Sequence, residues 1–343
     1  MSKGITVKEI ARRAGVSPAT VSRVLNGGRG VGNGKCEAVK NAVQEISPEL
    51  LPGLRKQQRG KTIGMLLFPQ SDKEPRVILE KLTGTLKVLP EKWNLLLLSP
   101  EIMPLELESK YLKGEIAGLL LMGHRLKTEG FEKILSGIPH VWMNSHDLDQ
   151  GKSNVMMGNE FAGRLAARYL MRRSCRNPLW LQIAPSMNPG FPSRTDGFRF
   201  EFFAAGKSCR SCVLTPPKEL RFWEEASDEQ LEQLFAGQLA DPSSTLSTAD
   251  GIFSPEERLT AILHRSLRKY GGRKIRKKWP DIISCNHVPE YLTGLYPRPA
   301  SIDLGPRSVA RLGMEELLRR ISGLPPGGDR ISVITTPELI QGD

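Results

Sequence analysis

The sequence predicts a small all-α N-terminal domain followed by an α/β core of two doubly wound lobes. Residues 6–26 have the spacing of two short helices joined by a tight turn. From Thr62 onward, apolar runs of strand length alternate with stretches of helical spacing, which is the pattern of parallel sheets with helices on both faces. These units are too numerous for one sheet, so we expect two similar lobes with a cleft between them. The predicted domains are residues 1–46, a linker at 47–61, and the core at 62–343.

The charge of the chain is uneven along its length. The net charge is +12, and residues 1–61 carry twelve Lys or Arg against four Asp or Glu, a net of +8. A basic N-terminal segment fits a polyanionic partner. No apolar run approaches the ~18 residues of a membrane span, and Met1 leads into the first helix without a signal peptide. Five cysteines, an odd number, predict reduced thiols and a cytoplasmic protein.

The first predicted helix begins at Thr6, because Thr6 and Glu9 have the spacing of a capping box. Gly15 ends it, since glycine adopts the left-handed conformation at a helix C-terminus at little cost. The predicted buried face has 3.6-residue spacing and consists of Val7, Ile10, Ala11 and Ala14.

The second predicted helix is capped by Ser17, with Pro18 in its first turn. Val21, Val24 and Leu25 form its apolar side. Its outer side carries small, hydroxyl-bearing and basic residues: Pro18, Ala19, Thr20, Ser22, Arg23 and Asn26. This face suits the major groove of DNA, because small residues allow close approach while Thr and Arg donate hydrogen bonds. The alternative is an ordinary helical hairpin on a protein surface.

A third helix is predicted at 35–46, with an apolar face of Ala38, Val39, Ala42, Val43 and Ile46. The glycine-rich segment before it nearly spells a phosphate-binding loop. Arg29 and Cys36 depart from that motif, and a helix precedes the segment where a strand is required. We therefore interpret it as a loop.

The core is predicted to alternate strands and helices. The predicted strands are 63–68, 95–98, 116–122, 140–144, 179–183, 251–253 and 281–285. The predicted helices are 77–89, 131–135, 161–172, 194–205, 230–239, 260–270 and 309–321.

Two further motifs invite a functional interpretation. The Cys209-x-x-Cys212 pair is better explained as two loop cysteines than as a redox or zinc site, since no second pair exists. The basic stretch 268–278 could bind nucleic acid, but we favour a solvated loop. The sequence shows no catalytic constellation, no metal-ligand cluster and no cofactor motif, so we predict that the chain is not an enzyme.

Residues 7–26 resemble the DNA-binding headpiece of the LacI/GalR family of bacterial regulators. The resemblance is nearly continuous through Val-Lys-Glu-Ile-Ala at 7–11, Ala-Gly-Val-Ser at 14–17 and Thr-Val-Ser-Arg-Val-Leu-Asn at 20–26. Residues from about 61 to 343 resemble the effector-binding core of that family, which is similar to periplasmic sugar-binding proteins. The landmarks stand in order at 62–64, 158–163, 194–198, 299–304 and 337–340.

The resemblance implies that the headpieces of a homodimer bind a near-palindromic DNA operator. The implied DNA-binding residues are Thr6, Ser17, Pro18, Ala19, Thr20, Ser22, Arg23, Asn26, Leu54 and Arg55. Leu54 is the candidate for the family's minor-groove wedge in the linker, although the family's Tyr-x-Pro-Asn and Ala-Arg elements are missing here.

The resemblance also implies a small-molecule site between the lobes. Arg194 occupies the place of the family's effector-binding Arg, and its fork of donors can bind two ligand oxygens. The alternative is a surface ion pair. The other implied positions are Asn144, Phe222, Trp223, Glu256, Glu257 and Asn286.

At four positions where the family usually carries Asp or an Asn-Asp pair, this chain has Asn144, Gly158, Glu256-Glu257 and Asn286. The sequence therefore predicts a ligand with a carboxylate or phosphate, such as a sugar acid or sugar phosphate, in place of a neutral hexose. A second possibility is that ligand control is weakened. Two rival functions are a sugar-binding transport protein, which needs a signal peptide and no basic headpiece, and an enzyme, which needs a catalytic constellation.

Overall fold

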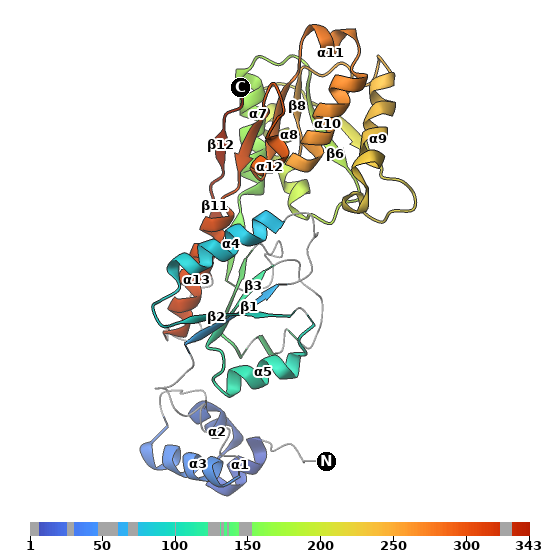
Figure 1. The fold of residues 1–343 in the computed structure, drawn as a ribbon. Coiled ribbons are helices and arrows are strands. Elements are labelled where there is room, and N and C mark those ends of the chain that lie inside the picture. The colour runs from blue at the N-terminus through green and yellow to red at the C-terminus, as the bar shows by residue number, and fades with distance from the viewer. Residues whose placement is uncertain are drawn as a thin grey trace. The chain divides into compact units, whose positions relative to one another are not determined.

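The computed structural model describes residues 7–25, 31–46, 61–67, 75–99, 101–122, 131, 134–135, 137–143, 153–322 and 331–343. The chain divides into two compact units (Figure 1). Unit 1 comprises Met1–Pro69, Val88–Met143 and Gly313–Arg330. Unit 2 comprises Gln70–Lys87, Asn144–Leu312 and Ile331–Asp343.

The N-terminal part of unit 1, here called the headpiece, is a bundle of three helices (Figure 1). They are α1 (Val7–Ala14), α2 (Pro18–Leu25) and α3 (Asn33–Ile46). Their shared core consists of Ile10, Ala11, Val21, Val24, Val39, Ala42 and Val43. The prediction that Val7 is buried is wrong. Val7 is 42% exposed, because it is the first residue of α1 and lies at the edge of the bundle.

The turn between α1 and α2 has the predicted chemistry. Gly15 has a φ of +63°, and its N–H donates to the Arg12 carbonyl at 3.4 Å. The Val16 N–H donates to the Ala11 carbonyl at 3.1 Å, which completes a Schellman motif. Ser17 Oγ then accepts from the Thr20 N–H at 3.1 Å and caps α2. The contacts that form this turn all lie within residues 11–20.

The α/β part of unit 1 contains four parallel strands in the order β4-β3-β1-β2. The strands are β1 (Thr62–Leu67), β2 (Asn94–Leu98), β3 (Gly118–Met122) and β4 (His140–Met143). All five residues of β3 are buried, as expected for a strand covered on both faces. The sequence did not predict α5 (Pro104–Leu112), and the helix predicted at 131–135 lies only partly within the described residues.

The main sheet of unit 2 has the order β12-β10-β9-β8-β6-β7 and is parallel except for the β10–β12 pair. Its strands are β6 (Pro178–Ile183), β7 (Arg210–Leu214), β8 (Gly251–Phe253), β9 (Asp281–Cys285), β10 (Ala300–Asp303) and β12 (Glu338–Ile340). The strands β5 (Asn154–Met157) and β11 (Ser332–Thr335) pair in parallel and are not part of this sheet. The two α/β units agree with the predicted fold class.

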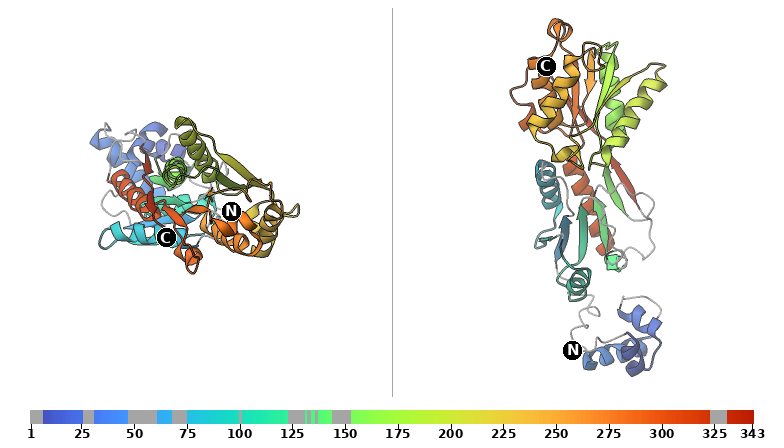
Figure 2. Two further views of the ribbon diagram at one scale, coloured as in Figure 1. Left: turned by 90° about the horizontal axis from the view of Figure 1, so that it is seen from above. Right: turned by 90° about the vertical axis from the view of Figure 1, so that its right-hand side faces the viewer.

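Helices cover both faces of the unit 2 sheet (Figure 2). The yellow and orange helices α9 and α10 lie on one side of the strands, and the green helices α7 and α8 lie on the other. Their bounds are α7 (Asn159–Arg172), α8 (Gly190–Ala204), α9 (Asp228–Ala240) and α10 (Glu257–Tyr270). The remaining helices are α4 (Pro75–Val88), the 3-10 helix η3 (Trp223–Glu225), α11 (Arg273–Lys277), α12 (Pro289–Leu292) and α13 (Pro306–Ile321).

Two glycines allow α7 and α8 to pack unusually closely. A Cβ on Gly163 would lie 1.9 Å from the Arg194 carbonyl oxygen, and one on Gly197 would lie 2.0 Å from that of Glu160. No side chain fits either place. The close packing holds the start of α7, at Asn159, beside Arg194 of α8.

Several elements differ from the prediction. The sequence did not predict the strands β5, β7, β10, β11 and β12. The basic stretch 268–278 is not a plain loop, since α11 forms within it around the buried Ile275. Cys212 lies in β7 and is buried, so it is not a loop cysteine. All five cysteines are free thiols, and burial raises the pKa of Cys212 to about 11.

Candidate DNA-binding face and unit 2 cavity

The exposed side of α2 carries the residues predicted to face DNA. Ser17, Pro18, Ala19 and Arg23 are exposed, and Thr20 is half-buried. Val21 and Val24 hold the opposite side of the helix in the headpiece core. The side chain of Ser22, and the whole of Thr6, Asn26, Leu54 and Arg55, lie outside what the structure describes. The described part is a capped helix with an exposed basic and hydroxyl-bearing face.

Arg194 is the centre of a buried polar cluster in unit 2. Only 3% of the residue is exposed. Its Nε donates to Asn159 Oδ1 at 2.9 Å, its Nη2 donates to Asn286 Oδ1 at 2.9 Å, and its Nη1 donates to the Pro255 carbonyl. The guanidinium also lies 5.2 Å from the ring centroid of Phe191. These contacts exclude the surface ion pair considered as the alternative.

The contacts of Arg194 leave it limited capacity for a ligand. Three of its five N–H donors point to protein oxygens, and all three of those oxygens belong to uncharged groups. Its first role in the described structure is to join three segments that follow β5, β8 and β9. Any ligand contact must use the remaining donors.

Asn286 and His287 form a tight turn after β9. Their φ angles are +97° and +51°, in a region that residues other than glycine rarely adopt. The Asn286 N–H donates to the Ile302 carbonyl at 2.9 Å, and the His287 N–H donates to Glu257 Oε1 at 2.8 Å. The turn is therefore held from β10 on one side and from α10 on the other.

Glu257, predicted to contact effector, is 1% exposed and bonds to protein groups. Its Oε1 accepts from Ser301 Oγ at 2.5 Å, from Ser284 Oγ at 3.0 Å and from the His287 N–H. Its Oε2 has no hydrogen-bond partner among the described residues. Burial raises the pKa of Glu257 to about 7, and the three donated hydrogen bonds offset part of that rise.

A cavity of about 410 Å³ lies within unit 2, at the carboxyl ends of β9 and β10. Parallel sheets commonly bind ligands at this edge. The cavity is lined by Arg76, Val77, Glu80, Asn286, His287, Val288, Asp303, Gly305, Pro306, Arg307, Ser308, Thr336 and Glu338.

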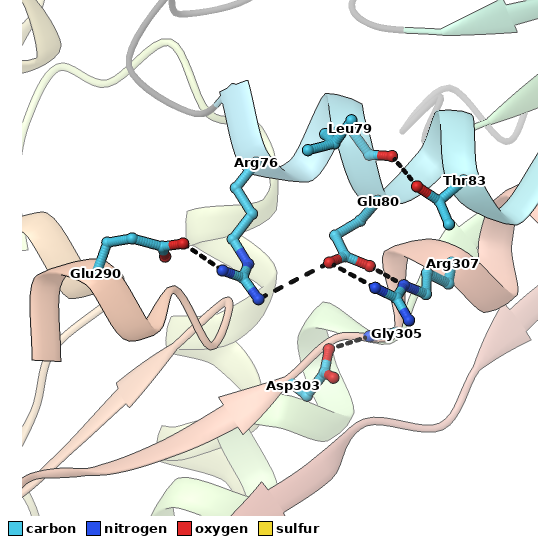
Figure 3. Close-up of polar contacts among 8 residues, drawn as sticks. All are labelled: Arg76, Leu79, Glu80, Thr83, Glu290, Asp303, Gly305 and Arg307. Atoms are coloured by element: carbon cyan, nitrogen blue, oxygen red, sulfur yellow. Dashed lines mark hydrogen bonds and ion pairs between the residues drawn. The ribbon is translucent and has the colours of Figure 1, made fainter. Parts of the chain in front are cut away.

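Ion pairs cross the wall of the cavity (Figure 3). Glu80 on α4 faces Arg307 at the start of α13, whose Nη2 lies 3.1 Å from Glu80 Oε1 and whose Nε donates to Oε2. Arg76 lies 3.8 Å from Glu80 and also bonds Glu290 on α12. Both cavity arginines are thus neutralised by carboxylates. The described lining also contains Asp303 and Glu338, so its three carboxylates outnumber its two arginines.

The other predicted effector residues are dispersed. Trp223 is 1% exposed and packs in the core, with its ring centroid 6.3 Å from that of Phe191. Phe222 is half-buried, and the Arg221 guanidinium lies 5.1 Å from its ring centroid. Glu256 is buried at the N-terminus of α10. Asn144 lies outside the described residues. The structure brings together Arg194 and Asn286, and among the predicted residues that it describes only Asn286 lines the cavity.

Sequence analysis missed four residues that shape this region: Asn159, Glu80, Asp303 and Arg307. Asn159 lies in a landmark segment recognised at 158–163 and could have been proposed as the partner of Arg194. The Arg76 and Glu80 spacing of i,i+4 marks a helical ion pair. Arg307 carried no local pattern, because its partner Glu80 is 227 residues away.

The described residues contain neither a metal-binding cluster nor a membrane-spanning helix. No cluster of three or more His, Cys, Asp or Glu residues is placed to hold a metal ion within these ranges. Within the same part of the chain, no helix is long and apolar enough to cross a membrane.

A capped helix-turn-helix with an exposed polar face, followed by two α/β units, defines a class of DNA-binding regulators. Residues 6–47 match the family model described as bacterial regulatory proteins of the lacI family. The HTH-type transcriptional regulator GntR of Pseudomonas aeruginosa is 28% identical over 325 residues, 93% of this chain and 90% of that protein. The HTH-type transcriptional repressor PurR of Salmonella paratyphi A is 30% identical over 182 residues, 50% of this chain and 52% of that protein.

Two solved structures share the fold. The transcriptional regulator CelR in complex with cellobiose aligns over 99% of both chains, with a TM-score of 0.63 and 20% identity. The lac repressor dimer bound to operator and the anti-inducer ONPF aligns over 99% of this chain and 98% of that one, with a TM-score of 0.61 and 16% identity. The family-model match assigns residues 6–47 to the lacI family of bacterial regulatory proteins, and the chain as a whole is similar to HTH-type transcriptional regulators.

Proposed function

We propose that this protein is a cytoplasmic, sequence-specific repressor that binds a near-palindromic operator as a homodimer and responds to a small-molecule effector. Residues 1–46 contact DNA, residues 47–61 link the headpiece to the core, and residues 62–343 bind effector and dimerise. The observation that carries the proposal is α2, whose Ser17 cap and buried Val21 and Val24 direct Arg23 and Thr20 outward.

DNA binding is tested with fluorescent duplexes that the wild-type protein selects from a random-sequence pool. Affinity should fall steeply as salt rises, because binding releases counterions from phosphates. Arg23→Ala should cost roughly 1–3 kcal/mol at selected sites if Arg23 contacts a base edge, and should weaken all duplexes evenly if it contacts phosphate. Arg199→Ala, which removes an exposed arginine of α8, is the matched control. Undiminished binding by a variant lacking residues 1–61 would contradict the proposal.

The charges of unit 2 bear on the effector class. Arg194 is bonded to three protein oxygens, and both cavity arginines are paired with carboxylates. An anionic ligand would have to displace Glu80 from Arg307, whereas sugar hydroxyls can both donate to carboxylates and accept from arginines. These contacts support a neutral, hydroxyl-rich effector over the sugar acid or sugar phosphate suggested by the sequence. The solved complex of CelR with cellobiose agrees with carbohydrate recognition on this fold.

Thermal-shift measurements with cellobiose, neutral monosaccharides, sugar acids and sugar phosphates would separate these classes. A neutral sugar should raise the melting temperature, and Glu80→Gln should reduce that rise. Glu232→Gln is the matched control, because Glu232 pairs with Lys269 at 2.8 Å on a different part of unit 2. A response confined to acids or phosphates and abolished by Arg194→Ala would instead support the anionic ligand.

The alternative functions are an effector-insensitive regulator with a degenerate pocket and a soluble sugar-binding protein. The first is favoured if no compound changes either melting temperature or operator affinity. The second requires ligand binding without any sequence-selective DNA binding.

A further inference from the structure

We infer that Glu257 is a positioning residue that holds the Asn286–His287 turn, and through it one wall of the unit 2 cavity and the orientation of Arg194. Only the use of the cavity by an effector rests on the proposed function. The geometry of the turn is a property of the protein alone and can be tested without a ligand.

The turn needs external support. Two consecutive residues other than glycine have positive φ angles, and each such residue carries a conformational cost. The hydrogen bonds of the two turn amides, to Ile302 and Glu257, offset that cost. Of these two acceptors only Glu257 is a side chain, so it is the one that substitution can remove.

Glu257 is itself held in place. Ser284 on β9 and Ser301 on β10 donate to the same Oε1 atom that accepts the His287 amide. One oxygen therefore joins α10, two adjacent strands and the turn. Because the group is fully buried, this acceptor cannot be replaced by water without opening the core.

The turn transmits this geometry to the cavity and to Arg194. Asn286 and His287 both line the cavity, and Asn286 Oδ1 accepts from Arg194 Nη2. Arg194 Nη1 donates to the carbonyl of Pro255, two residues before Glu257. Glu257 thus affects the guanidinium by two routes, through the turn and through the connection from β8 to α10. The charged or titratable groups joined in this cluster are Glu257, His287 and Arg194.

Glu224 provides a matched control elsewhere in unit 2. It is also buried, at 6% exposure, and its Oε1 accepts from a backbone amide, that of Met187, at 2.9 Å and from the Ser186 hydroxyl. Its Oε2 likewise has no hydrogen-bond partner among the described residues. Substitutions of Glu224 therefore reproduce the loss of a buried carboxylate without removing an acceptor from the 286–287 turn.

The test is hydrogen–deuterium exchange on the full-length protein without ligand, with Glu257→Leu, Glu257→Gln, Ser301→Ala and Glu224→Leu. Glu257→Leu should speed exchange of the His287 amide by roughly tenfold or more relative to amides in α7, since it removes the acceptor of that amide. Glu257→Gln should restore slow exchange, because its amide oxygen can accept the same bond. Ser301→Ala should give a smaller increase in the exchange rate of the His287 amide. This variant replaces Glu257→Leu in the test if Glu257→Leu does not fold.

The wild-type His287 amide resonance should also titrate with the Glu257 carboxyl, with a midpoint near pH 7, and should not do so in Glu257→Gln. Unchanged exchange at residues 286–292 in both Glu257→Leu and Ser301→Ala would overturn the inference. Equal local exchange in Glu224→Leu and Glu257→Leu would overturn it as well. Failure to find any effector would count against the proposed function. The exchange measurements would still test the role of Glu257 in the turn.

Discussion

At the scale of single residues, unit 2 buries two ionisable side chains, Arg194 and Glu257, in different surroundings. Arg194 lies among neutral oxygens, three of which accept hydrogen bonds from its guanidinium. Glu257 can instead become neutral, and burial raises its pKa to about 7. The Asn286–His287 turn connects the two groups, since it donates to Glu257 and accepts from Arg194.

Glu257 should make the stability of the protein depend on pH. Below pH 4.5 the carboxyl is protonated in both the folded and the unfolded state, so its contribution is then at its most favourable. Between about pH 4.5 and 7 the unfolded state loses its proton while the folded state keeps it, so the free energy of unfolding falls. The fall should be on the order of 3 kcal/mol and absent in Glu257→Gln. Denaturant unfolding at pH 5 and pH 8 measures it, and parallel pH profiles for the two proteins would refute it.

At the scale of elements, close helix packing decides where functional groups meet. The α7–α8 pair depends on Gly163 and Gly197, whose missing side chains allow each helix to reach the backbone of the other. Neither helix contains a local feature that requires its glycine. The need arises only when the two are packed together.

Gly163→Ala should therefore destabilise the protein by at least roughly 1–3 kcal/mol, because the new methyl group meets a carbonyl that cannot move independently. The control is Gly237→Ala in α9, where a Cβ meets nothing within 4 Å. That change should stabilise the protein by about 0.4–1 kcal/mol, since alanine favours the helical conformation more than glycine does. Chemical denaturation of both variants measures the contrast. Similar effects at the two sites would show that the α7–α8 contact is looser than described.

At the scale of the whole molecule, the proposed homodimer needs an exposed contact surface. α4 has an exposed stripe of Leu79, Thr83 and Leu86 at i, i+4 and i+7 spacing, with the two leucines 62% and 56% exposed. Thr83 Oγ1 donates to the Leu79 carbonyl at 2.8 Å, which leaves the stripe less polar. Figure 3 shows Glu80 directed toward Arg307, on the other side of the helix from Leu79. A stripe of this kind suits packing against a second helix.

Light scattering should show a dimer at micromolar concentration without DNA. The double variant Leu79→Glu, Leu86→Glu should shift it toward monomer, because charges would be buried without partners. Phe203→Glu, on an 81% exposed position of α8, is the control and should leave the dimer intact. A monomeric wild-type protein would contradict the homodimer. An unaffected dimer in the double variant would place its interface elsewhere.

The sequence by itself determined the headpiece, because its turn, cap and apolar spacing act within about twenty residues. Ser17, Gly15, Ile10 and Val21 have the predicted roles, whereas the end residue Val7 is exposed. Many of the core strands and helices were also predictable from the pattern of apolar residues, whereas β5, β10 and β12 were not predicted.

Only the tertiary structure decided the contacts of unit 2. The sequence named Arg194 and Asn286 separately by resemblance, but their contact with each other and with Asn159 depends on segments up to 127 residues apart in the chain. It assigned Glu257 to the effector, whereas folding buries that carboxylate under three donors. The ion pair between Glu80 and Arg307 could not be predicted from the sequence, because the two residues are 227 positions apart. Local sequence patterns predict the secondary structure of a segment. The burial of a side chain and its long-range partners depend instead on which segments the sheets bring together.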